Sequence, residues 1–285
     1  MVKRIITSVV ALAVFVGILF LPPIYFTVAL AAVILFMLYE CYSATKADLG
    51  MKTIGFISAV ILMSSIYFCK AIEWDIFAWA TASIGIIFII ALHMITVVAK
   101  HGKRNYKDIL SNGFLTIYIV LSMSCVWLAK ETFDTATMLL TFICAWSCDT
   151  FAYFTGRFLG KHKLIPHVSP NKTVEGSVGG VVGAMVICIV YLLIVKNVFD
   201  TNMLTWSNVV VEGAVYGLVG GALSQLGDLI ASAIKRDTEI KDFGWIFPGH
   251  GGFMDRFDSV MFIAPIMYIL PLSLIHISDP TRLRC

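Results

Sequence analysis

Long apolar runs constrain the fold of this chain more than any other feature of its sequence. Ile5–Leu21 is 17 residues long and Ile76–Ala99 is 24 residues long, and neither run contains an acidic or basic residue. A helix needs about 20 apolar residues to cross the hydrocarbon core of a bilayer. A soluble helix of that length would show a polar face, which these runs lack. The sequence therefore predicts membrane-spanning helices, in agreement with a charged fraction of only 14%.

The whole apolar pattern predicts an all-α integral membrane protein, a polytopic bundle of about nine transmembrane helices with cytoplasmic catalytic loops. The predicted spans are 5–21, 24–40, 53–70, 76–99, 109–129, 136–155, 174–195, 207–230 and 259–275. The first is interpreted as an uncleaved span, because no small-residue cleavage site follows it. Glycines four residues apart in the seventh and eighth spans indicate close helix packing. We expect one membrane domain over 1–270, with N-terminal spans in 1–135 and catalytic spans and loops in 136–270.

Basic residues gather at the N-terminus and in alternate connections, those after the second, fourth, sixth and eighth spans. The intervening connections combine single lysines with acidic residues. The positive-inside rule places the basic connections in the cytoplasm. We therefore expect a multi-pass protein of a membrane such as the bacterial inner membrane, with its active site facing the cytoplasm. A net charge of +3 gives no indication of a nucleic-acid partner.

Polar residues in and after the sixth predicted span mark the first candidate site. Asp149 lies in an otherwise apolar stretch, and Arg157 follows two helical turns later on the same face. Charge at membrane depth is costly and usually faces a polar cavity or a partner. The two residues are therefore either a structural pair or part of the rim of a polar site.

The segment Ser169–Gly176 follows, and Pro170 breaks any helix there. We expect Lys172, Thr173 and Glu175 at the start of the seventh span, where free backbone N–H groups attract anions. Lys172 is then either a phosphate contact or only a charge that flanks the span.

The segment Ser224–Ser259 is the most informative in the chain. Its first part places four polar residues on one helical face, at i, i+4, i+7 and i+8: Asp228, Ser232, Lys235 and Arg236. Three glycines in Pro248–Gly252 let the backbone approach a ligand closely. Asp255 and Asp258 then stand at i and i+3 where the last span begins. Carboxylates suit Mg²⁺, and lysine and arginine suit phosphates, so the segment favours a nucleotide or phosphate site.

This segment resembles the signature of the phosphatidate cytidylyltransferases, the CDP-diacylglycerol synthases. The resemblance is carried at matching spacing by the stretches Asp149–Tyr153, Gly156–Arg157, Gly160–Lys161, Ser169–Gly176, Gly227–Leu229, Ser232–Arg236, Lys241–Gly244 and Pro248–Asp258. Three positions depart from the family pattern: Asn171 stands where lysine is common, Ala231 where glutamate is common, and Phe243 where serine is usual.

The resemblance implies that CTP and phosphatidic acid react to CDP-diacylglycerol and pyrophosphate, with Mg²⁺ as cofactor. It implies that Asp228 and Asp255 hold the metal with Asp258 beside them, and it implies that three basic residues act on the phosphates: Lys172, Lys235 and Arg236. The substrate-binding residues that it implies are Asp149, Arg157, Ser169, Thr173, Glu175, Ser232, Lys241, Asp242, His250, Gly251, Gly252 and Arg256. The partners implied are CTP, phosphatidic acid and the lipid bilayer, and a homodimer is left open.

Two other functions stay open at this point. A related CTP-dependent membrane enzyme would act on another lipid, as a polyprenol kinase or an archaeal-lipid cytidylyltransferase does. A transporter also carries carboxylates in its spans, but here the polar residues cluster at one face and no inverted repeat is visible. Residues 271–285 are interpreted as a non-native tail, because Leu272–Arg282 reads like a translated sequencing adapter.

Overall fold

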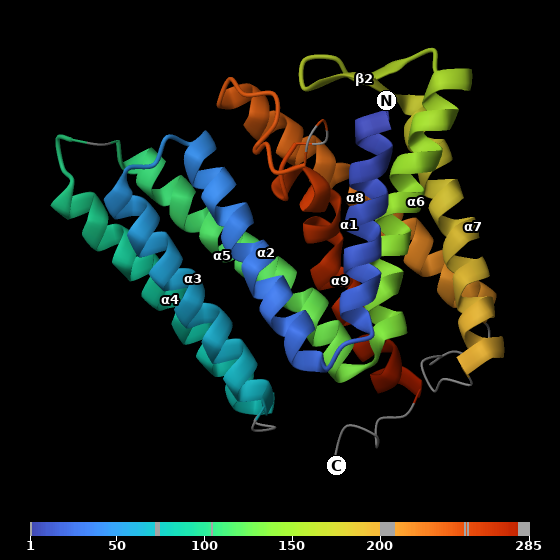
Figure 1. The fold of residues 1–285 in the computed structure, drawn as a ribbon, viewed down its shortest axis with the longest axis horizontal. Coiled ribbons are helices and arrows are strands. Elements are labelled where there is room, and N and C mark those ends of the chain that lie inside the picture. Colours follow the sequence, from blue (N-terminus) through green and yellow to red (C-terminus); the bar gives the residue numbers. More distant parts are fainter. Residues whose placement is uncertain are drawn as a thin grey trace. The chain divides into compact units, whose positions relative to one another are not determined.

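The computed structural model describes residues 2–71, 75–103, 105–199, 209–247, 249 and 251–278. Over these residues the chain is helical apart from connections and one short hairpin (Figure 1). The helices are α1 (Val2–Leu19), α2 (Pro23–Ala44), α3 (Leu49–Ala71), α4 (Asp75–Ala99), α5 (Tyr106–Thr132), α6 (Thr135–Leu159), α7 (Val174–Phe199), α8 (Val209–Asp237) and α9 (Met254–Ser278). The antiparallel strands β1 (Lys163–Ile165) and β2 (Ser169–Thr173) lie between α6 and α7 in the chain.

Within the described residues, six helices are long and apolar enough to cross a membrane: α2, α3, α5, α6, α7 and α8. The described apolar parts of α1 and α4 are shorter, at Val9–Leu19 and Ser83–Ala99. Each of the nine predicted spans coincides with a helix of the structure. An all-α membrane fold is thus supported, and a bilayer crossing by all nine helices stays a prediction.

The hairpin differs from the helix start that the sequence indicated for Lys172 and Thr173. Both residues belong to β2, and Lys163 pairs with Thr173 across the two strands. Thr173 ends the strand, and its hydroxyl accepts a hydrogen bond from the backbone N–H of Gly176 at 3.1 Å. A threonine in this role caps the first turn of the following helix, so α7 begins at Val174.

The chain divides into two compact units, and neither is contiguous in sequence. The first comprises residues 1–124 and 238–256, and the second comprises 125–237 and 257–285. In the first unit α3 packs along α4 and against α2. Its buried core includes Tyr42, whose hydroxyl shares a 2.6 Å hydrogen bond with the hydroxyl of Thr116 on α5.

In the second unit α7 packs between α6 and α8 through glycines. A Cβ atom at Gly180 would lie 2.8 Å from Cβ of Ala152 on α6, and one at Gly213 would lie 2.6 Å from Cα of Ile189. These contacts confirm the close packing that the glycine spacing indicated. In a bilayer such backbone approach supplies the van der Waals contact that holds helices together.

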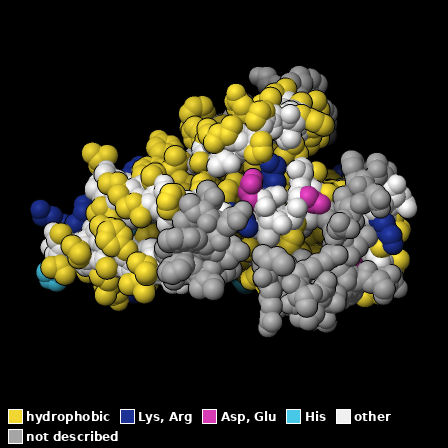
Figure 2. Space-filling view, turned by 90° about the horizontal axis from the view of Figure 1, so that it is seen from below, with side chains coloured by type: hydrophobic (Ala, Val, Ile, Leu, Met, Phe, Trp, Pro, Cys, Tyr) yellow, Lys and Arg dark blue, Asp and Glu magenta, His cyan; other side chains and the backbone are white. Residues whose placement is uncertain are grey.

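The opposite face of α7 carries a stripe of exposed valines at a spacing of four residues: Val178, Val182, Val186 and Val190. Hydrophobic side chains also cover much of the described surface in the view of Figure 2. Apolar residues exposed in this way would be unfavourable in water and favourable against lipid tails. The exposed surface therefore agrees with a membrane setting for these helices.

Candidate active site

The second unit brings together a lysine of the hairpin and an aspartate of α8. Nζ of Lys172 lies 2.6 Å from Oδ2 of Asp228, and both side chains are about one quarter exposed, at 24% and 29%. The hydroxyl of Ser232 donates to the other oxygen of the same carboxylate at 3.4 Å, which confirms the helical face predicted for Asp228 and Ser232. Two residues predicted for different ligands, a metal and a phosphate, thus neutralise one another when neither ligand is bound.

Asp258 adds a second carboxylate close to Asp228. A Cβ atom at Gly227 would lie only 2.7 Å from the backbone oxygen of Asp258, so the start of α9 lies directly against α8. Burial and, secondly, the negative charge of Asp228 raise the pKa of Asp258 to about 7. Two carboxylates that disfavour each other's ionisation form a site where a bound cation would be stabilised.

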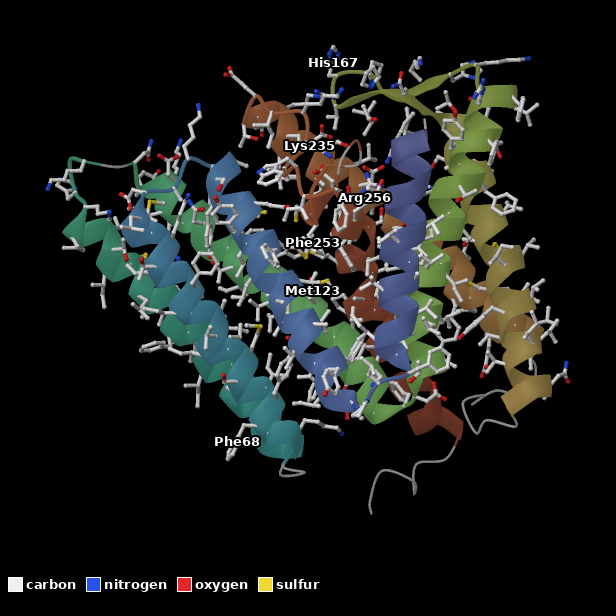
Figure 3. The ribbon with its side chains drawn as sticks, in the orientation of Figure 1. Phe68, Met123, His167, Lys235, Phe253 and Arg256 are labelled. Atoms are coloured by element: carbon white, nitrogen blue, oxygen red, sulfur yellow. The ribbon has the colours of Figure 1, made fainter. Side chains whose placement is uncertain are left out.

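Asp149 and Lys235 complete this cluster of charges. The charge of Asp149 on α6 further raises the pKa of Asp258, whereas the charge of Lys235 on α8 lowers it. Figure 3 shows Lys235 near the end of α8 that faces the hairpin. We call these five residues the charge cluster, and it consists of Asp149, Lys172, Asp228, Lys235 and Asp258. It combines carboxylates for a cation with ammonium groups for phosphates.

Two other predicted site residues hold the hairpin in place. Nε of Arg236 donates to the backbone oxygen of Val168 at 3.3 Å, next to His167 at the exposed turn (Figure 3). Glu175, in the first turn of α7, accepts hydrogen bonds from the backbone N–H groups of Lys161 and His162. Its carboxylate also lies 2.6 Å from Nδ1 of His162. These contacts give both residues a structural role, and any contact of theirs with substrate stays a prediction.

The remaining predicted residues of the second unit lie at its surface. Arg157 is exposed and donates to the hydroxyl of Tyr153 at 2.9 Å, one turn earlier on α6. Ser169 is the first residue of β2, and it pairs with Ile165. Neither contact decides between a structural pair and a site rim for Asp149 and Arg157.

The first unit contains Asp255 and the glycine turn. Oδ2 of Asp255 accepts hydrogen bonds from the backbone N–H groups of Phe243 at 2.8 Å and Gly252 at 3.0 Å. Gly251 has a φ of +81°, a conformation that glycine adopts without strain. Asp255 thus orders the loop before α9, and a metal would have to share or replace these hydrogen bonds.

The neighbours of this turn are more exposed. Lys241 and Asp242 precede it and Arg256 follows it, and all three side chains are exposed. Asp255 and Asp258 stand one helical turn apart at the start of α9, as the sequence predicted. His250 lies outside the described residues.

Sequence reasoning missed Glu40, the buried carboxylate of α2. Only 3% of this residue is exposed, and it accepts hydrogen bonds from the backbone N–H groups of Phe253 and Met254. The signal in the sequence was an acidic residue at the very end of the predicted span 24–40. Ionisable residues in spans usually mark function or a buried partner.

The carboxylates offer the oxygen donors that Mg²⁺ prefers, although within the described parts of the chain no three His, Cys, Asp or Glu side chains form a metal-binding group. Mg²⁺ is commonly held by one or two carboxylates, with substrate phosphates and water as the other ligands. The neighbouring carboxylates Asp228 and Asp258 fit that mode of binding.

Comparison with known proteins gives consistent matches. A sequence model described as the Cytidylyltransferase family matches residues 2–274. The phosphatidate cytidylyltransferase of Bacillus subtilis is 32% identical over 275 residues, which cover 95% of this chain and 97% of that protein. The phosphatidate cytidylyltransferase of Staphylococcus saprophyticus is 31% identical over 273 residues, 94% of this chain and 97% of that protein. A Staphylococcus aureus protein of the same name is 44% identical over 133 residues, 47% of this chain and 48% of that protein.

Proposed function

This chain belongs to the cytidylyltransferase family, and from that premise we propose that it makes CDP-diacylglycerol and pyrophosphate from CTP and phosphatidic acid. The observation that carries the proposal is the similarity to phosphatidate cytidylyltransferases over nearly the whole length of both chains. The charge cluster supports it, because carboxylates and lysines side by side suit a metal–nucleotide complex. The product is an activated lipid for phospholipid biosynthesis.

The reaction is a transfer of a cytidylyl group between phosphates. An oxygen of the lipid phosphate attacks the α-phosphorus of CTP, and the bond from that phosphorus to the bridging oxygen of pyrophosphate breaks. The attacking phosphate is already ionised at neutral pH, so the enzyme needs no strong general base. Its work is to position the two phosphates and to neutralise their charge.

We assign the metal to Asp228 and Asp255, with Asp258 beside them. Mg²⁺ bound there would neutralise charge on the triphosphate of CTP. Asp228 releases Lys172 when the metal binds, and Lys172 then turns to a phosphate together with Lys235 and Arg236. The ion pair of Lys172 and Asp228 supports this exchange of partners.

The lipid and the nucleotide approach from different sides in this proposal. Arg256, which is exposed, is suited to the phosphate of phosphatidic acid. The membrane gives the acyl chains a lateral path to the site. All nine helices cross the bacterial inner membrane, and the basic connections and the site face the cytoplasm, where CTP is available.

The test is an assay of the purified protein in detergent with labelled CTP and a panel of lipids. With label on the α-phosphate, we expect a labelled lipid from phosphatidic acid and none from a polyprenol or an archaeal ether lipid. With label on the γ-phosphate, we expect labelled pyrophosphate and an unlabelled lipid. Transfer of the γ-label to a polyprenol would show a kinase and contradict the proposal.

A further inference from the structure

A carboxylate at membrane depth holds the segment that precedes α9. Glu40 lies on α2, a candidate membrane span, and only 3% of it is exposed. Its Oε1 accepts from the backbone N–H of Phe253 at 3.1 Å, and its Oε2 accepts from the backbone N–H of Met254 at 2.8 Å. These N–H groups belong to the beginning of α9, where the helix dipole favours a negative charge. Glu40 therefore anchors a helix start that is more than 200 residues away in sequence.

The surrounding packing leaves room for this carboxylate and for little else. A Cβ atom at Gly244 or at Gly252 would overlap the carboxylate of Glu40. One turn earlier on α2, Phe36 stacks on Phe253 with ring centroids 5.5 Å apart. Phe247 packs edge-on against the other contact of the same ring, with centroids 4.9 Å apart. The segment 243–254 thus folds around the end of α2 (Figure 3, where Phe253 is labelled).

Two carboxylates share the task of ordering this segment. Glu40 holds the backbone at Phe253 and Met254, and Asp255 holds it at Phe243 and Gly252. Asp255 is the residue that directly follows Met254. A change at Glu40 therefore reaches the carboxylate of Asp255 through a single peptide unit.

We propose that Glu40 is a positioning residue for cytidylyl transfer. It fixes the backbone at Phe253 and Met254, and thereby the position of Asp255 and of the glycine turn. This inference rests on the proposed function, in which Asp255 binds the metal. A glutamine at this position keeps one acceptor oxygen but turns an NH₂ group toward a backbone N–H, so it cannot satisfy both.

The first test compares Glu40→Gln with Glu239→Gln, which makes the same chemical change at an exposed residue of the same connection. We expect kcat of folded Glu40→Gln to fall about tenfold to a hundredfold, because small misplacements of a reacting group have costs of that order. We expect KM for CTP to change less than about twofold, since the loss is in the transition state. Glu239→Gln should match the wild type. A folded Glu40→Gln protein with wild-type kcat would overturn the proposal.

The second test measures the anchor directly and does not depend on activity. Hydrogen exchange of the amides at Phe253 and Met254 should accelerate in Glu40→Gln, whereas exchange in α3 and α4 should stay as in the wild type. Unchanged exchange at these two amides would overturn the inference. If the wild type itself fails to convert phosphatidic acid, the proposed function fails, and the exchange result still decides whether Glu40 is the anchor.

A second variant covers the case in which Glu40→Gln does not fold. Gly244→Ala leaves the carboxylate chemically intact but places a methyl group where it lies. We expect this variant to lower kcat and to accelerate the same two amides. Combining it with Glu40→Ala, which frees the space, should cost no more than Glu40→Ala alone. Fully additive losses would show that the two residues act separately and would contradict the proposal.

Discussion

Nζ of Lys172 and Oδ2 of Asp228 lie 2.6 Å apart and join β2 to α8. The ion pair is only partly exposed, so water screens it less than it would a surface pair. Asp258 lies close enough to Asp228 for its pKa to be raised by that charge. Lys172 therefore supplies positive charge at the place where we propose the metal, and the two cations compete for the same carboxylate.

This competition gives Lys172→Met a distinctive kinetic pattern. Removing the ammonium group should lower kcat/KM for CTP about tenfold or more, because a hydrogen bond to a charged phosphate is lost. The magnesium concentration that gives half the maximal rate should fall, because Asp228 loses its competing partner. Steady-state kinetics at varied magnesium measures both values. Lys163→Met, on the exposed strand β1, is the control. A raised magnesium requirement would contradict the exchange of partners.

Asp228→Asn and Asp255→Asn should each remove most of the turnover. Losing a charged metal ligand costs several kcal/mol of transition-state stabilisation, on the order of a thousandfold in rate. Both variants should need far more magnesium than the wild type. Asp242→Asn, in the loop interior, should cost less if that residue only orders the loop. Near-normal activity of both variants at ordinary magnesium would refute the metal site.

The orientation of the helices is open to chemical labelling. In a variant without the seven native cysteines, a cysteine in place of Lys103 or Lys241 should react with a membrane-impermeant maleimide only after the cells are opened. Both positions are exposed, so access through the aqueous phase decides the result. A cysteine in place of Glu131, in the connection between α5 and α6, should react in intact cells. Labelling of position 241 from outside would place the loop away from CTP.

The glycine contacts between α7 and α8 predict a stability effect of their own. In Gly217→Ala the new methyl group would overlap the backbone of Met185, so we expect a loss of about 1–3 kcal/mol from overpacking. Gly17→Ala in α1 is the matched control, because a Cβ atom there meets nothing within 4 Å. Thermal unfolding in detergent should show a lower midpoint for Gly217→Ala alone. Equal midpoints for the two variants would show that the close contact is not limiting.

The parts of the site that follow from local sequence periodicity could be predicted. The shared face of Asp228 and Ser232 depends only on 3.6 residues per turn, and the structure has the hydrogen bond that this face allows. The same holds for the positions of Asp255 and Asp258 at the start of α9. Helix extents follow from the length of the apolar runs for the same reason.

The parts that depend on distant partners could not be predicted in this way. The three residues of β1 are too few for a strand pattern, and Lys163 pairs with Thr173 only because the turn between the strands brings them together. Glu40 looked like the polar end of a span, since its partners at Phe253 and Met254 lie at the other end of the chain. No periodicity contains such a pairing.

The assignment of residues 238–256 to the first unit has a consequence for how the gene can be divided. The chain leaves the second unit at Asp237 and returns to it at Phe257, so no single stretch of codons encodes either unit. A fragment that begins at Cys125 would carry the loop of Asp255 without the helix that holds Glu40. The amino-terminal helices are therefore inherited together with the carboxy-terminal half as one selectable whole, although most of the family signature lies outside them.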